Sequence, residues 1–227
     1  SCAGAKVRVS KKERPLTDFA GLQETLFEEG TIKSKTRSIR IIKPEVQKHV
    51  ESKDIDWALA DTRMGIISAP MGAGKTTSVI KWINEERERQ RQKRHLQGKP
   101  PKPFRVLLLV TRITQAMNFG NKYPGMKSYL DVEGSVAEHE SSVLCVNSLA
   151  RALSSEGRIP HFGLLILDEI EALIEALLGP SLSQGGKTRQ CHIWQLFIVL
   201  LCASKRVLFM DGILTSRTAK YLDDLGV

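Results

Sequence analysis

Residues 64–77 read MGIISAPMGAGKTT, a short apolar run followed directly by a glycine-rich loop. The run Met64–Ser68 has the length and the composition of a buried strand. From Lys75 onward apolar residues recur at helical spacing, which predicts a helix beginning there. Its expected inner face consists of Val79, Ile80, Trp82 and Ile83. A strand, a glycine-rich loop and a helix in this order form the context in which phosphate-binding loops are found.

The loop departs from the usual phosphate-binding pattern at one position. Residues 69–76 read APMGAGKT where the pattern is G-x-x-x-x-G-K-[ST], so Ala69 replaces the first glycine. Gly72 and Gly74 can turn their N–H groups toward phosphate oxygens, and the helix N-terminus adds a favourable dipole. Lys75 is expected to reach the β- and γ-phosphates of ATP, and the Thr76 hydroxyl to bind Mg²⁺. The complete set of expected ATP-binding residues is Pro70, Met71, Gly72, Ala73, Gly74, Lys75, Thr76 and Thr77.

A second segment, LLILDEIE at 164–171, reads as a buried strand that ends in carboxylates. Asp168 is suited to hold Mg²⁺, directly or through water. Glu169 is suited to orient or deprotonate the attacking water, so we expect hydrolysis with Lys75 and Glu169 as catalytic residues. Alone, the two acids could simply favour the dipole of a helix N-terminus. Their occurrence together with the loop favours a metal site and a base.

The rest of the chain alternates between apolar strands and helices. Strands are expected at 104–110, 143–146, 164–167 and 206–210, and further helices at 44–60, 169–178, 190–203 and 215–225. The GKPPKP segment at 98–103 should end the helix that begins at Lys75, and a Ser/Gly-rich loop is expected at 181–188. This alternation indicates an α/β domain with a parallel sheet and helices on both faces.

The formal net charge of +9 is concentrated in two segments. Residues 1–48 hold 11 basic and 6 acidic side chains, and residues 85–105 hold 8 and 3. Clustered positive charge attracts phosphate polymers, although a solvated tail and a solvated helix are the alternative interpretation. We expect residues 1–43 to form a basic arm without sustained periodicity, with one short helix near 18–29.

Cysteine usage and hydropathy exclude several classes of protein. The four cysteines form no C-x-x-C pair, which indicates a reducing compartment, and the five histidines lack zinc-like spacing. The longest apolar stretch, residues 193–203, is too short to span a bilayer, so we expect no membrane association. Aromatic residues make up only 6%, which favours contacts to a nucleic-acid backbone over base stacking.

Four further segments resemble motifs of superfamily 2 helicases. TRITQAMNF at 111–119 is similar to motif Ia, NSLARAL at 147–153 to motif Ib, and DEIE at 168–171 to the D-E-x-D/H box, while DGILT at 211–215 stands where motif III is found. With the loop, these segments resemble herpesvirus-type replication origin-binding proteins, which are DNA helicases, over roughly residues 60–225. Glu171 in place of Asp or His, and Ile170 in place of Ala, depart from the common pattern and leave the subfamily open.

The resemblance implies a RecA-like P-loop domain that binds ATP at the C-terminal ends of its parallel strands. Asp211 and Thr215 would couple the nucleotide state to the grip on the nucleic acid. Helix capping by Thr111, Asn147 and Thr215, and solvated arginines at 112 and 151, are the alternative interpretations. The side chains implied as contacts to the nucleic-acid backbone are Thr111, Arg112, Asn147, Ser148 and Arg151.

The implied function is an ATP-driven DNA helicase, with single-stranded or origin duplex DNA and other replication proteins as partners. An RNA helicase motor domain, or a nucleotide-gated DNA-binding module without unwinding activity, fits the same motifs. The long interval between Lys75 and Asp168 argues against a small-molecule kinase. We expect residues 44–227 to be the first RecA-like domain of a longer intracellular protein, acting in a nucleus or at a viral replication site. We expect the second RecA-like domain to lie outside this sequence, so weak ATP binding, slow ATP turnover and no processive unwinding are expected.

Overall fold

The computed structural model describes residues 30–33, 38–42, 49–60, 62–123, 125–179, 187–213, 215, 218, 220 and 221. The short helix expected near residues 18–29 lies outside these ranges. Most of the loop expected at 181–188 and most of the helix expected at 215–225 also lie outside them.

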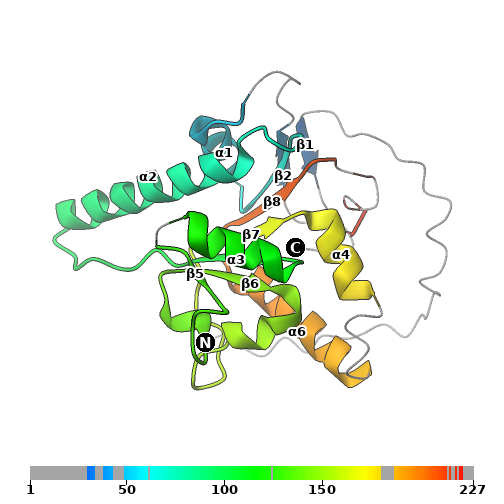
Figure 1. The fold of residues 1–227 in the computed structure, drawn as a ribbon. Coiled ribbons are helices and arrows are strands. Elements are labelled where there is room, and N and C mark those ends of the chain that lie inside the picture. The colour runs from blue at the N-terminus through cyan, green and yellow to red at the C-terminus, as the bar shows by residue number, and fades with distance from the viewer. Residues whose placement is uncertain are drawn as a thin grey trace.

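An eight-stranded sheet forms the centre of the described structure (Figure 1). Its strand order is β1-β2-β3-β8-β7-β4-β6-β5. Neighbouring strands are parallel, except that β1 runs antiparallel to β2. The strands are β1 (Gly30–Lys33), β2 (Ser38–Ile42), β3 (Met64–Ser68), β4 (Val106–Val110), β5 (Lys127–Ser128), β6 (Ser141–Cys145), β7 (Leu164–Asp168) and β8 (Val207–Asp211).

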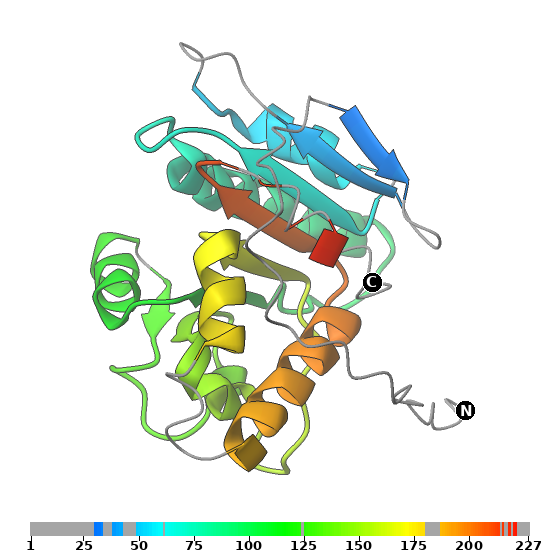
Figure 2. The same cartoon turned by 90° about the vertical axis from the view of Figure 1, so that its right-hand side faces the viewer.

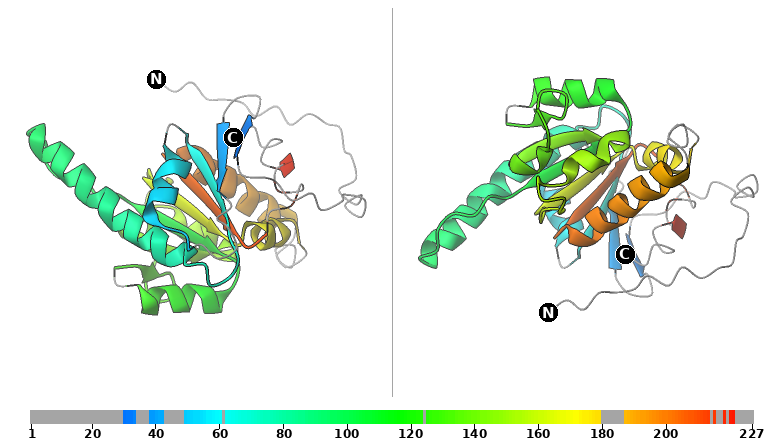
Figure 3. Two further views of the ribbon diagram at one scale, coloured as in Figure 1. Left: turned by 90° about the horizontal axis from the view of Figure 1, so that it is seen from above. Right: turned by 90° about the horizontal axis from the view of Figure 1, so that it is seen from below.

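Helices cover both faces of this sheet (Figures 2 and 3). One face carries α1 (Ser52–Leu59), α2 (Lys75–Leu96) and α3 (Ile113–Lys122), and the other carries α4 (Ile170–Leu178) and α6 (Lys187–Ala203). Two 3-10 helices, η2 (Val136–Glu138) and η3 (Val146–Ala152), flank β6. The chain crosses the sheet in one direction between β3 and β6 and returns between β6 and β8, and right-handed crossovers then place the connecting helices on opposite faces. The predicted RecA-like α/β fold is confirmed.

Burial explains why the central strands are mostly apolar. Every residue of β3, β4 and β6 is buried, because helices exclude water from both faces. Helix α2 begins at Lys75 as predicted, and its inner face buries Val79, Trp82 and Ile83. Ile80 packs partly buried against the same core.

Two expectations for the N-terminal part are wrong. The expected basic arm contains two strands, β1 and β2, and β2 pairs in parallel with β3. The sequence of β2, SIRII, is rich in isoleucine, whose branched side chain favours strands. Residues 44–48 of the helix expected at 44–60 lie outside the described ranges, and within those ranges the helix begins only at Ser52. Residues just before it are held extended because the Val50 N–H donates to the Ala73 carbonyl at 2.9 Å.

Other differences concern strand ends. β4 begins at Val106 rather than at residue 104, and β6 includes the buried serines Ser141 and Ser142. β7 and β8 each extend one residue further than expected, to Asp168 and Asp211. Both carboxylates therefore belong to the ordered sheet edge rather than to the loops beyond it.

Candidate nucleotide-binding site

Three distant sequence segments meet at the C-terminal edge of the sheet. Strand β8 lies between β3 and β7, and the register pairs Ser68 with Asp211 and Asp168 with Met210. The Ala69 N–H donates to the Asp211 carbonyl at 3.0 Å, which ties the start of the glycine-rich loop to the end of β8. The loop, Asp168 and Asp211 therefore converge on one edge, where ligands of open α/β sheets bind.

The loop between β3 and α2 needs its glycines. Gly72 and Gly74 have φ values of 84° and 78°, in the left-handed region that side chains other than that of glycine rarely adopt. The Ala73 N–H donates to the Pro70 carbonyl at 3.2 Å, and Gly74 is the N-cap of α2. Ala73 is buried, whereas Pro70 and Met71 are exposed. The result is a tight loop that leads into the N-terminus of a long helix, an arrangement suited to anions.

Lys75 lies at the start of α2 beside this loop. Its Nζ donates to the Ala69 carbonyl, and to the Pro70 carbonyl at 3.1 Å. Burial lowers the pKa of Lys75, while Asp168, Asp211 and Glu169 act in the opposite direction. Thr76 follows it and is half-buried, and Thr77 is exposed. A cation surrounded by loop carbonyls and three carboxylates is suited to exchange those partners for an anionic ligand.

The environment of Asp168 at this edge shifts the pKa of its carboxyl group. Burial, and next the neighbouring Glu169, raise its pKa to about 6. Lys75 acts in the opposite direction, and Asp211 adds to the increase. A carboxylate in this position favours a nearby divalent cation, because the cation compensates the charge that burial penalises.

Glu169 has an unusual backbone. Its φ and ψ are 56° and 60°, and it is the only non-glycine residue with positive φ among those the structure describes. This left-handed residue is the N-cap of α4, and its carbonyl accepts a hydrogen bond from the Leu173 N–H at 2.9 Å. Strained backbone of this kind costs about 1–3 kcal/mol and concentrates at functional sites. The conformation fixes the point at which the Glu169 side chain leaves the sheet edge.

Asp211 and Glu171 connect the ends of β7 and β8. One Asp211 carboxylate oxygen accepts from the Glu171 N–H at 2.9 Å, and the other accepts from the Gly212 N–H at 2.6 Å. The Glu171 carboxylate accepts from the Thr215 hydroxyl at 2.5 Å and from the Thr215 N–H at 3.1 Å. The Thr218 hydroxyl donates to the same carboxylate oxygen. Glu171 and Thr218 were not among the site residues expected from sequence, although the fourth position of DEIE marked Glu171 as a departure from the helicase pattern.

The expected nucleic-acid contacts lie further along the same edge. β4 and β6 are neighbours, and Val110 pairs with Cys145, so Thr111 and Asn147 follow adjacent strand ends. Thr111 donates through its hydroxyl to the Gln115 side-chain oxygen at 3.3 Å, and Arg112 is the exposed N-cap of α3. Asn147 is exposed and Ser148 is half-buried, both within η3. The structure thus brings these four residues to one side of the candidate nucleotide site.

Arg151 is bonded differently from the other expected contacts. Its guanidinium donates to the Gly134 carbonyl at 2.8 Å and to the carbonyls of Tyr129 and Val132. The same group lies 5.6 Å from the centre of the Tyr129 ring. These bonds give Arg151 a structural role in holding the segment before η2, and its contact with nucleic acid stays a prediction.

The residues at this edge fit a magnesium ion held partly by a ligand. Among the residues described, no three His, Cys, Asp or Glu side chains gather into a metal-binding cluster. Mg²⁺ commonly uses one or two protein ligands together with substrate phosphates and water. Asp168 and the Thr76 hydroxyl match that donor chemistry.

These features define a RecA-like α/β domain with its candidate ligand site at the carboxyl edge of a parallel sheet. The chain belongs to the family described as origin of replication binding protein, whose model matches residues 22–225.

Two similar proteins come from viruses. A putative replication origin-binding protein of Acanthamoeba polyphaga mimivirus is 23% identical over 179 residues, which cover 76% of this chain and 21% of the relative. The replication origin-binding protein of varicella-zoster virus (strain Dumas) is 26% identical over 179 residues, which cover 76% of this chain and 19% of the relative. The chain spans about a fifth of the length of these curated relatives. Separately, no helix in the described part of the chain is long and apolar enough to cross a membrane.

Proposed function

We propose that this chain is the ATP-binding motor domain of a replication origin-binding DNA helicase, which couples ATP hydrolysis to DNA binding and unwinding. The observation that carries the proposal is the convergence of the glycine-rich loop, Asp168 and Asp211 at the ends of the adjacent strands β3, β7 and β8. The names of the mimivirus and varicella-zoster relatives support DNA at a replication origin as the partner. Action in a nucleus or at a viral replication site follows from the same proposal.

Each residue of the edge has a role in the proposed hydrolysis. The N–H groups of Gly72 and Gly74 bind phosphate oxygens, and Lys75 leaves the carbonyls of Ala69 and Pro70 for the β- and γ-phosphates. Mg²⁺, held by Thr76 and Asp168, would neutralise charge on the phosphates. Glu169 orients a water, which attacks the γ-phosphorus as the bond to the β,γ-bridging oxygen breaks, and Glu169 accepts the water's proton. ADP and inorganic phosphate are the products.

The hydrogen bonds beyond β7 and β8 support a coupling role for Asp211 and Thr215. Asp168 and Glu169 would sense the phosphates, and Glu171 lies two residues further along the same chain. Because Glu171 bonds to Thr215 and its N–H bonds to Asp211, a shift at the phosphates would pass to the segment after β8. Thr111, Arg112, Asn147 and Ser148 would contact the DNA backbone on the adjacent part of the edge.

The test is nucleotide-dependent binding to single-stranded DNA, duplex DNA and single-stranded RNA, measured with and without a magnesium–ATP analogue. The parent chain should bind the analogue and change its affinity for DNA in response. Lys75→Ala should lose both the binding and the response, whereas Lys81→Ala, an exposed lysine on the same helix, should keep them. Equal or tighter binding of RNA would replace the DNA assignment with an RNA-directed motor. A nucleotide response without unwinding by the whole protein would favour a nucleotide-gated binding module.

A further inference from the structure

Helix α2 extends well beyond the sheet on which it packs (Figure 3). Its 22 residues span about 33 Å, whereas the 5 residues of β3 span about 17 Å. The last buried residue of α2 is Glu86, and residues 88–97 are exposed or half-exposed. Because α2 begins at the candidate nucleotide site, its far end projects past the opposite edge of the sheet.

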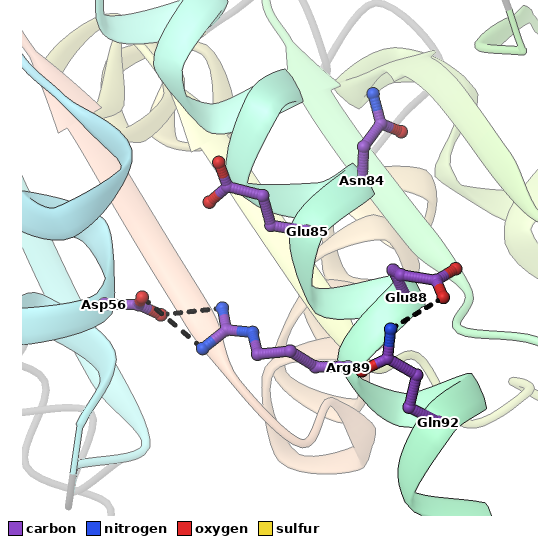
Figure 4. A pocket seen from close by; sticks show the side chains of 6 residues that line it. All are labelled: Asp56, Asn84, Glu85, Glu88, Arg89 and Gln92. Atoms are coloured by element: carbon purple, nitrogen blue, oxygen red, sulfur yellow. Dashed lines mark hydrogen bonds and ion pairs between the residues drawn. The ribbon is translucent and has the colours of Figure 1, made fainter. Parts of the chain in front are cut away.

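The base of this projection is fixed by a cluster of ion pairs. Arg89 donates to both carboxylate oxygens of Asp56 in α1, at 2.8 and 3.4 Å (Figure 4). Arg206, next to β8, donates to Glu86 at 3.0 Å. The guanidinium groups of Arg89 and Arg206 lie 5.9 and 5.7 Å from the Trp82 ring centre. The basic groups of the base are therefore paired, and they hold α2 in a defined direction.

Beyond this base the charge balance changes. Residues 90–105 contain no aspartate or glutamate. We call Arg91, Lys93, Arg94, Lys99 and Lys102 the basic tip; all are exposed except Arg94, which is half-exposed. Among the described residues, one residue of the basic tip takes part in an ion pair: Arg91 lies 4.0 Å from the Glu88 carboxylate. The basic tip thus presents positive charge that the protein itself leaves largely uncompensated.

A defined turn arranges these groups. Gly98 has a φ of 61° and follows the C-cap of α2, where glycine is favoured. The Lys99 N–H donates to the Arg94 carbonyl at 2.9 Å, and the Arg94 Nε donates to the Pro100 carbonyl at 2.6 Å. Arg94 and Lys99 are therefore held beside each other before any partner binds.

The helix dipole accounts for only part of this pattern. Cations in the last turn of a helix are favourable, which applies to Lys93 and Arg94. Lys99 and Lys102 lie beyond the helix and gain nothing from its last turn. The exposed large apolar side chain of this region is Leu96, so the basic tip lacks the apolar centre typical of a protein–protein interface. Uncompensated cations on a fixed support are suited to a polymer of phosphates.

We propose that the basic tip binds the phosphodiester backbone of nucleic acid, independently of nucleotide, at the edge of the domain opposite the candidate ATP site. The choice of duplex DNA as the natural polymer rests on the proposed function. Binding of this kind adds affinity without sequence preference and is sensitive to salt. It would hold DNA near the domain while the loops at the other edge bind and release.

The experiment uses residues 1–227 and a tip variant that combines Arg91→Gln, Lys93→Gln, Lys99→Gln and Lys102→Gln. Arg94 is kept because its side chain holds the turn. A control variant combines Lys53→Gln, Lys81→Gln, Arg158→Gln and Lys205→Gln, four exposed cations elsewhere, and so has the same net charge. Affinity for duplex DNA, single-stranded DNA and single-stranded RNA is measured without nucleotide across a salt series.

The tip variant should bind duplex DNA at least tenfold more weakly at low salt. The negative slope of log affinity against log salt should become shallower by about 3–4, because each lost phosphate contact removes about 0.9 from its magnitude. The control variant should change little, and both should bind a magnesium–ATP analogue like the parent. Parent-like DNA binding by the tip variant overturns the proposal and leaves an acidic protein as the partner of the basic tip. An equal loss of affinity in the control variant also overturns it, because net charge then explains the binding. If the tip variant loses affinity only for single-stranded RNA or only for single-stranded DNA, that polymer would replace duplex DNA as the ligand of the basic tip. A parent chain that fails to respond to nucleotide would instead contradict the proposed motor function and leave this comparison intact.

Discussion

Glu171 and Thr215 form a direct side-chain link between the segments that follow β7 and β8. The Thr215 hydroxyl donates to the Glu171 carboxylate at 2.5 Å, and the Thr215 N–H donates to the same oxygen at 3.1 Å. In the reverse direction the Glu171 N–H donates to Asp211 at 2.9 Å. The two segments are thus bonded reciprocally just beyond Asp168 and Asp211, so neither can shift without affecting the other.

Thr215→Val should weaken this link while preserving the shape of the side chain. The free energy of unfolding should fall by about 1–3 kcal/mol, because a half-buried carboxylate loses a charge-assisted hydrogen bond. Urea denaturation measures this, with Thr114→Val on the exposed face of α3 as the matched control. A double-mutant cycle with Glu171→Gln should show coupling between the two changes, and strictly additive effects would contradict the link.

Asp168→Asn should change how stability depends on pH. The folded protein raises the pKa of Asp168 from 3.8 to about 6, mainly through burial. Between these values the unfolded chain has released a proton that the folded protein still holds, so the contribution of Asp168 to stability falls as pH rises through this window. The full loss is on the order of 3 kcal/mol. The asparagine variant does not undergo this loss. Its stability relative to the parent should therefore increase as pH rises to about 6 and then level off.

Denaturant unfolding at a series of pH values tests this expectation. Asp131→Asn, which neutralises an exposed carboxylate, is the control and should not show the same divergence. A stability difference between Asp168→Asn and the parent that is constant from about pH 4 to pH 7 would contradict the raised pKa.

Local sequence was sufficient to predict most of the candidate site. β3 and the start of α2 fall where predicted, because the change from an apolar run to glycines and then to helical spacing marks both boundaries. Asp168 and Asp211 were expected near strand ends, because each follows an apolar run directly. The parallel order of the strands then brings the three segments to one edge.

Contacts between distant segments could not be predicted in the same way. Glu171 and Thr215 are separated by 44 positions, and their bond depends on β7 and β8 being neighbours, which neither strand encodes alone. Arg151 looked like a solvent-facing cation or a phosphate ligand, but its donors are used by carbonyls of a loop that has no regular pattern. β2 was missed because a basic segment surrounds it, and its strand character emerges through pairing with β3.

Gly65→Ala should destabilise the fold through a close approach of α1 to β3. A Cβ at this position would lie 2.8 Å from the Ala58 carbonyl oxygen and 2.9 Å from the Ala58 Cβ. Neither is the end of a flexible side chain, so α1 would have to shift, at a cost of about 1–3 kcal/mol. Gly212→Ala is the control, because a Cβ there meets nothing within 4 Å. Thermal unfolding compares the two, and equal melting temperatures would show that α1 moves freely on the sheet.

Glu169→Gln should separate nucleotide binding from hydrolysis. The amide keeps the size of the side chain but cannot accept the proton of the attacking water. The affinity for a magnesium–ATP analogue should stay within a few-fold of the parent, while ATP turnover should fall by at least about 100-fold. Phosphate release under single-turnover conditions measures the second quantity. Because slow turnover is expected of the parent as well, Lys75→Ala provides the background rate. Undiminished hydrolysis in Glu169→Gln would remove this residue from the mechanism.

The left-handed backbone of Glu169 predicts that glycine is more stabilising than alanine at this position, the reverse of their order in a helix interior. At a φ of 56° an alanine side chain is strained by about 1–2 kcal/mol, whereas glycine is not. Glu169→Gly should therefore be more stable than Glu169→Ala by about 1 kcal/mol. Glu175, in the middle of α4, supplies the matched comparison: there the alanine variant should be the more stable by about 1 kcal/mol, because glycine is unfavourable in a helix interior. Urea denaturation of the four variants gives both differences. The same sign at both positions would mean that residue 169 relaxes to ordinary helical geometry, and that strain does not fix the direction of its side chain.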